Sequence, residues 1–138
     1  IEIKSPYEIL SESKENSFIF NRYWQIEKKF NKLVEKAKII GRRPGKLLFF
    51  QYSGDLSLSS DLANELFYSF PGKFIVVVYI KNIKANISIR GKNVLEMTLK
   101  AIEGLENATG GGHRDSTGAK VMIDDLPKFR ERIGEMVR

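Results

Sequence analysis

The chain has 138 residues, 42% of them hydrophobic, which fits one compact globular domain with enough apolar side chains for a core. Lysine and arginine number 23 against 17 acidic residues, so the net charge is +6, a balance that favours a polyanionic partner, nucleic acid first. The absence of cysteine excludes disulfide scaffolds, thiolate zinc sites and cysteine nucleophiles and favours a cytoplasmic protein, and no apolar run approaches the roughly 20 residues of a membrane helix.

The first third of the chain predicts a long helix ahead of a strand. Residues 1–16 predict an entry segment with one helical turn after Ser5-Pro6. From Phe18 to about Ile40, apolar residues recur three and four apart, which is typical of one helix face, and the glycines and proline of residues 41–45 end the helix. We therefore divide the chain into an N-terminal segment with a helical arm, residues 1–45, and a second domain, residues 46–138.

The second domain opens with a predicted strand, helix and strand. The run KLLFFQYS at residues 46–53 predicts a buried strand, and residues 59–70 predict a helix that Ser59 or Ser60 caps. The run KFIVVVYIK at residues 73–81 lacks alternation, as expected of a strand covered on both faces. This order of elements predicts a right-handed parallel crossover.

The following strand has two distinct faces. Residues 81–84 permit only a tight reversal, so ANISIRG at residues 85–91 should pair antiparallel with the preceding strand. Strand alternation places Asn86, Ser88 and Arg90 on one face, which brings a hydroxyl and a guanidinium side by side.

The C-terminal part predicts two more helices and one more strand. Asn93 and Glu96 form a capping-box pattern at the start of a helix. After a predicted loop from Thr109 to Gly118, residues 119–123 predict a strand, and Pro127 begins a last helix. The fold class is therefore α/β: a mixed sheet of about four to five strands flanked by helices and preceded by a long amphipathic helical arm.

The predicted loop contains three consecutive glycines, Gly110 to Gly112. Glycine-rich backbone adopts positive φ and lets a ligand approach closely. Its N–H groups can form an anion-binding concavity, with His113 and Arg114 in place to contact a phosphate or sugar. A flexible connector would show the same glycine content, so both interpretations stay open.

The helical arm also has two interpretations. Lys28, Lys32 and Lys36 follow one another at four-residue steps, with Lys29 beside them and Arg42-Arg43 after the helix. They form either a solvated polar face or a track for the nucleic-acid backbone. The apolar stripe of the same helix packs on the sheet, on a catalytic lobe or on another copy of the chain.

Three motifs together resemble a known family: SSDLANEL, NISIRG and the GGGH segment followed by Gly118-Ala119. They resemble the glycine-rich domain appended to DHH phosphoesterases over roughly residues 46–136, and the first two are most similar to RecJ-like proteins of archaea. The resemblance implies a C-terminal substrate-binding domain, whose N-terminal catalytic domain holds manganese or magnesium with an aspartate-rich site that includes the Asp-His-His signature. That signature is absent and the chain begins at Ile1, so we expect a piece of a longer protein, with no cofactor and no activity of its own.

The resemblance also implies roles for individual residues. Arg90 matches a strand arginine that contacts a phosphate, although an arginine at a strand end often only caps a carbonyl or faces water. Ser116-Thr117 stand where the family usually has two alanines, and Arg114-Asp115 also depart from its pattern. A metal at His113 is disfavoured because the aspartates are scattered over different elements. The predicted substrate-binding residues are Ser88, Arg90, Gly110, Gly111, Gly112, His113 and Arg114, with no catalytic or metal-ligating residue.

The function implied is the binding of single-stranded DNA or RNA as one lobe of a RecJ-like exonuclease, in contact with its own N-terminal catalytic domain and not with a membrane. The same lobe would also suit an oligonucleotide or dinucleotide substrate. A different class is a non-catalytic scaffold or RNA-binding module in a replication or repair assembly, as a homodimer or beside another partner. A related glycine-rich domain near the C-terminus of alanyl-tRNA synthetases aids RNA binding, although the NISIRG and SSDLANEL motifs favour the phosphoesterase branch.

Overall fold

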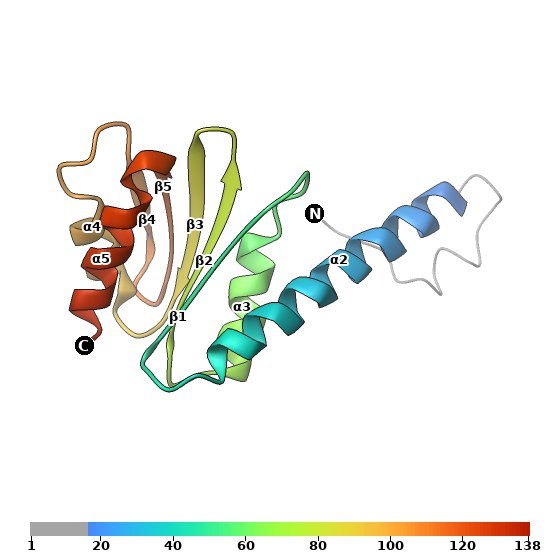
Figure 1. Ribbon diagram of the computed structural model, residues 1–138, viewed down its shortest axis with the longest axis horizontal. Helices are drawn as coiled ribbons and strands as arrows, with labels where there is room; N and C mark the ends of the chain where they lie inside the picture. Colours follow the sequence, from blue (N-terminus) through green and yellow to red (C-terminus); the bar gives the residue numbers. More distant parts are fainter. Residues whose placement is uncertain (1–16) are drawn as a thin grey trace.

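The computed structural model describes residues 17–138, so the predicted entry segment over residues 1–16 lies outside it. A long helix leads into a twisted sheet that has helices on both faces (Figure 1). Within this part of the chain, no helix is both long and apolar enough to cross a membrane. The elements in chain order are α2 (Ser17–Gly41), β1 (Leu47–Ser53), α3 (Ser59–Ser69), β2 (Phe74–Lys81), β3 (Lys84–Arg90), α4 (Val94–Ile102), β4 (Thr109–His113), β5 (Ser116–Met122), the 3₁₀ turn η2 (Ile123–Asp125) and α5 (Leu126–Met136).

The five strands form one mixed sheet in the order β1-β2-β3-β5-β4. β1 and β2 are parallel, as the predicted strand, helix and strand require, and every other pair is antiparallel. The predicted fold class is therefore confirmed.

The central strand β2 separates two cores. Val76 and Val78 pack with α4 and α5 on one face, while Ile75 and Val77 pack with α2 and α3 on the other. Residues 75–79 are all buried, which explains why this strand shows no alternation in the sequence.

Helix α2 is packed along only part of its length. Val34, Ala37 and Gly41 in its second half are buried against the α3 side of the sheet. Its first half projects beyond the sheet (Figure 1), and the side chains of Phe18 and Trp24 are 78% and 50% exposed. The residues on either side of position 45 thus share one core.

Two local predictions in the C-terminal half of the chain are wrong. The predicted loop from Thr109 to Gly118 is the β4–β5 hairpin, with a turn only at Arg114 and Asp115. Asn93 forms no side-chain cap on α4, because its backbone is left-handed at φ 58°. The hairpin turn caps this helix instead: the Asn93 N–H donates to Asp115 Oδ1 at 2.9 Å, and the Leu95 N–H donates to the Arg114 carbonyl at 3.1 Å.

The predicted serine cap of α3 is also wrong. The residue that precedes the helix is Leu58, and no side chain there bonds to the first turn. Ser59 and Ser60 lie inside the helix, and their hydroxyls bond to β3.

Candidate functional site

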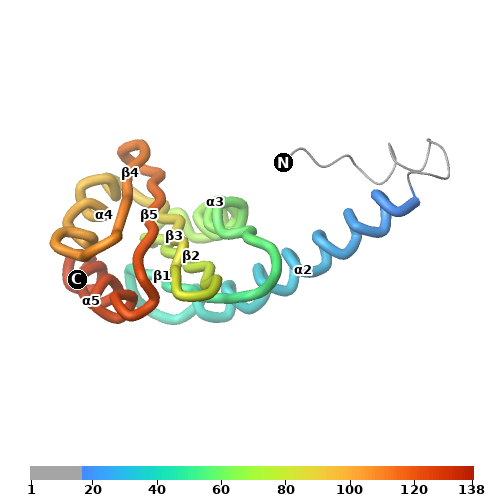
Figure 2. The backbone as a smooth tube through the Cα atoms, turned by 90° about the horizontal axis from the view of Figure 1, so that it is seen from above, coloured from blue at the N-terminus to red at the C-terminus, as the bar shows by residue number. Residues whose placement is uncertain are grey.

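One face of the sheet is only partly covered by helices. Helix α3 packs on β2 and β3, and α2 packs on β1. In Figure 2, α4 and α5 lie on one side of β4 and β5, and no helix lies against their other side. The uncovered area is therefore floored by β5 and β4 and bounded by α3.

The register fixes which residues form this floor, because directly paired residues of neighbouring strands share a face. Ser88 pairs with Gly118, which pairs with Gly111. In the next row, Arg90 pairs with Ser116, which pairs with His113. Four predicted site residues, Ser88, Arg90, Gly111 and His113, thus lie on one face of the sheet beside α3.

The three consecutive glycines have different surroundings. Gly111 belongs to the open floor, and a Cβ there would have nothing within 4 Å. Gly110 faces the opposite side, where a Cβ would lie 3.0 Å from Ile102 Cδ1. Gly112 has φ +139°, and a Cβ would lie 2.6 Å from the Ser116 carbonyl oxygen. Of these three glycines, only Gly111 therefore leaves room for a ligand on the floor.

Arg90 is a buried cation, 9% exposed, held by neutral groups. Its Nε donates to Asn64 Oδ1 at 2.7 Å, and its Nη2 donates to Ser60 Oγ at 3.1 Å. Its Nη1 donates to the carbonyls of Ile89 and Thr117. Burial lowers the pKa of Arg90. No ion pair to a carboxylate is found for it among residues 17–138, so its positive charge is left for an anion.

The four hydrogen bonds leave the guanidinium one donor to spare. Arginine has five N–H groups, and Nε, both protons of Nη1 and one proton of Nη2 are used. Arg90 thus does cap backbone carbonyls, as expected of an arginine at a strand end, but it uses only Nη1 for these bonds. One N–H on Nη2 has no acceptor among residues 17–138.

The start of α3 lies against the same groups. Ser88 Oγ donates to Ser59 Oγ at 3.3 Å, so the first turn of α3 sits over the middle of β3. The N-terminus of a helix carries partial positive charge and favours anions. The partial positive charge at the start of α3 therefore adds to the positive charge of Arg90.

Arg114 lies apart from this group. It occupies the hairpin turn, and its Nε lies 3.5 Å from Asp115 Oδ1. Its side chain lines a cavity of about 350 Å³ whose other lining residues belong to the start of α4 and to that helix. Arg114 and Gly110 are therefore on the α4 side of the sheet, and Gly112 serves the backbone of the hairpin.

Residues 17–138 offer no donor set for the manganese or magnesium that the resemblance implies. Nowhere in this range do three His, Asp or Glu side chains gather closely enough to hold an ion. The residues described here do not fit that metal.

The residues that hold Arg90 in place were not among the predicted site residues. Ser60 was expected as a candidate cap of a helix and Asn64 as part of that helix, but both bond to the guanidinium. Their spacing of four residues puts them on one helix face, and this polar pair beside the apolar Leu62 and Leu66 was the available signal.

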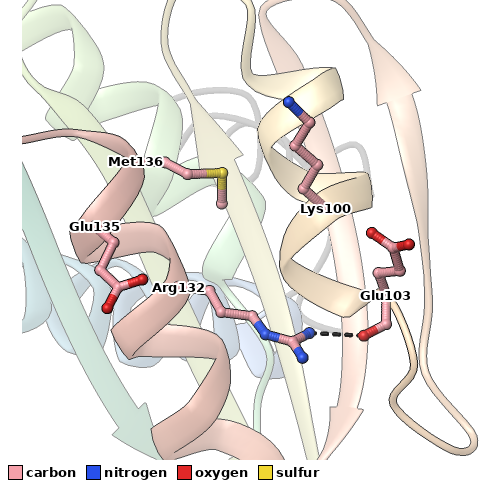
Figure 3. Close-up of a pocket in the computed structure, with 5 residues that line it drawn as sticks. All are labelled: Lys100, Glu103, Arg132, Glu135 and Met136. Carbon is pink, nitrogen blue, oxygen red and sulfur yellow. Dashed lines mark hydrogen bonds between the residues drawn. The ribbon is translucent and has the colours of Figure 1, made fainter.

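A second cavity, of about 440 Å³, lies between α4 and α5 (Figure 3). Arg132 donates to the carbonyls of Ala101 and Glu103 there, at 3.0 and 2.7 Å. The arginine thereby satisfies the last carbonyls of α4, so its contacts are explained by helix capping.

No protein-family model and no curated protein sequence matches the chain. Solved structures share its fold. RecJ from Thermus thermophilus, in complex with Mg²⁺, aligns with a TM-score of 0.64 at 16% identity, over 91% of this chain and 21% of that one. The pGpG-specific phosphodiesterase PggH from Vibrio cholerae aligns with a TM-score of 0.61 at 13% identity, over 97% and 46%.

The C-Ala domain of Aquifex aeolicus alanyl-tRNA synthetase aligns with a TM-score of 0.56 at 17% identity, over 70% of this chain and 96% of the domain. The expected likeness to RecJ and to the synthetase domain is thus confirmed at the level of the fold. The chain spans about a fifth of RecJ and less than half of the phosphodiesterase.

Proposed function

We propose that this chain is the substrate-binding lobe of a RecJ-like DHH phosphoesterase that acts on single-stranded nucleic acid. The main support is Arg90, a buried guanidinium with no carboxylate partner in the described part of the chain, beside an open floor of glycine. A phosphodiester supplies the negative charge that this site lacks.

In this proposal, a phosphate oxygen accepts a hydrogen bond from the remaining Nη2 N–H of Arg90, at the start of α3. The strand then lies over Gly111 and Gly118, where no side chain prevents close approach of the sugar-phosphate backbone. His113 stands in the row of Arg90 and offers a ring or a donor to a base or sugar. The other lobe of the parent enzyme would supply the metal and the attacking water.

The test is Gly111→Val, which places a branched side chain in the open floor. We expect the affinity for a labelled single strand to fall about tenfold or more, equivalent to about 1.4 kcal/mol, at an unchanged melting temperature. The matched control is Gly134→Val on α5, where a Cβ also meets nothing within 4 Å. Equal binding by both variants and the wild type in fluorescence anisotropy would show that the floor is not the site.

A short substrate such as a dinucleotide is the second candidate. The likeness to a pGpG-specific phosphodiesterase, which covers 97% of this chain, favours it. The two candidates differ in whether the protein contacts the strand outside the Arg90 site.

A further inference from the structure

A lysine-rich pocket of about 240 Å³ lies between α2 and the β1–α3 loop. Lys29, Lys32 and Lys36 of α2 line one wall. They follow at steps of three and four residues, so they share one helix face. The opposite wall is the loop from Ser53 to Leu56, closed by Tyr52 and Leu58.

The loop wall is held in place by two tyrosines. Tyr79 donates its hydroxyl to the Gly54 carbonyl at 2.7 Å, and the Leu58 N–H donates to the Tyr52 hydroxyl at 2.7 Å. Both rings are buried, with centroids 5.2 Å apart. The loop wall of the pocket is therefore fixed, because tyrosines of β1 and β2 hold it in place.

The charge of the pocket is not balanced. Lys29 Nζ lies 3.0 Å from Asp55 Oδ1, the one carboxylate of the lining. Three ammonium groups against one carboxylate leave two positive charges, and no ion pair of Lys32 or Lys36 is found within residues 17–138. An anion that enters the pocket would thus meet two unopposed lysines.

The start of α3 joins this pocket to the Arg90 site. Leu58 lines the pocket, and the next two residues, Ser59 and Ser60, bond to Ser88 and Arg90. The first turn of α3 therefore borders both sites, and a strand held at Arg90 would cross it to reach Lys32 and Lys36.

We infer that the pocket binds a backbone phosphate of the strand held at Arg90, further along that strand than the two phosphates of a 5′-phosphorylated dinucleotide. The inference rests on the proposed function and deepens it, because it makes the substrate a strand longer than a dinucleotide. Contacts of this kind are independent of base sequence and weaken with salt.

The experiment compares two probes on the full-length chain: a single strand of about 12 nucleotides and a 5′-phosphorylated dinucleotide. In Lys32→Gln/Lys36→Gln, the affinity for the long strand should fall about tenfold at about 0.1 M salt, and the slope of log affinity against log salt should become shallower by about 1.4. The affinity for the dinucleotide should not change. Lys32→Arg/Lys36→Arg should bind the long strand like the wild type.

The control is Lys100→Gln/Lys128→Gln, which removes the same charge from α4 and α5 on the other face of the sheet. An equal loss in the control, or an equal loss for both probes in the pocket variant, would mean diffuse attraction and would overturn the inference. If Gly111→Val weakens both probes and Lys32→Gln/Lys36→Gln weakens neither, the inference fails and the proposed function stands. If Gly111→Val changes the affinity for neither probe, the proposed function fails. The inference that one strand occupies both the Arg90 site and the pocket then fails as well.

Discussion

Two threonine hydroxyls meet in the core, one of them on Thr117, where the resemblance led us to expect alanine. Thr98 of α4 is fully buried and Thr117 of β5 nearly so, with 2.7 Å between their Oγ1 atoms. Thr98 Oγ1 also donates to the Val94 carbonyl at 2.7 Å. Since the hydroxyl proton of Thr98 is used in that bond, Thr98 Oγ1 accepts the hydrogen bond from the Thr117 hydroxyl. The departure at Thr117 is thus matched by a partner on α4.

This direction of donation predicts an asymmetry between two isosteric variants. Thr98→Val leaves the Thr117 hydroxyl buried without its partner, so it should lower the free energy of unfolding by about 1–3 kcal/mol. Thr117→Val removes one bond but leaves Thr98 bonded to Val94, so it should cost about 1 kcal/mol. Urea denaturation measures both. A larger cost for Thr117→Val would reverse the assigned donor.

The glycine strand predicts a second contrast in stability. Gly112→Ala should lower the free energy of unfolding by about 1–3 kcal/mol, because the new Cβ meets the Ser116 carbonyl and its φ of +139° suits only glycine. Gly111→Ala has open space and should change stability by less than about 0.5 kcal/mol. Chemical denaturation of both variants is the measurement. Similar costs would contradict the different surroundings of the two residues.

At the scale of elements, two helical glycines allow a test of how α2 joins the body. A Cβ on Gly41 would lie 2.6 Å from Phe70 Cε2 and 2.7 Å from Leu48 Cδ1, so Gly41→Ala should destabilise the fold by about 1–3 kcal/mol. Gly134→Ala on α5 meets nothing and should stabilise it by about 0.5–1 kcal/mol. Thermal melts of the two variants should move in opposite directions. A neutral Gly41→Ala would mean that the end of α2 is not tightly packed.

The elements that the sequence predicted well are those with an apolar pattern. The helix from Phe18 to Ile40 has apolar residues three and four apart, and β2 has an unbroken apolar run typical of a strand covered on both faces; the structure has both elements as predicted. Strand alternation assigned Ser88 and Arg90 to one face of β3, where the register places them.

The elements that the sequence did not predict are those held by tertiary contacts. β4 contains three glycines, so it has no side-chain pattern, and it is a strand only because β5 pairs with it. The start of α4 looked capped by its own Asn93, but the hairpin turn supplies the acceptors. Asn64 and Ser60 were missed as site residues because their partner Arg90 lies 26 and 30 residues away in the chain.

At the scale of the whole molecule, the sheet separates two layers with different roles. The α4–α5 side contains the Arg132 cap and the buried threonine pair. The α2–α3 side contains the Arg90 site and the lysine pocket. The two groups of cations in the proposal therefore lie on one side of the sheet, which favours a strand that crosses that side.

This division leads to a prediction about activity. Incubated with manganese and a labelled single strand, the purified chain should bind but not hydrolyse it. The proposed binding groups are Arg90, the glycine floor and the lysine pocket, whereas residues 17–138 contain no cluster of metal-ligating side chains and the sequence has a single histidine. Activation of water by a metal needs several ligands that converge on one ion. The measurement is product formation on a denaturing gel, with His113→Ala as the control for contamination. Turnover by the wild type that disappears in His113→Ala would place chemistry in this lobe and contradict the proposed division of labour.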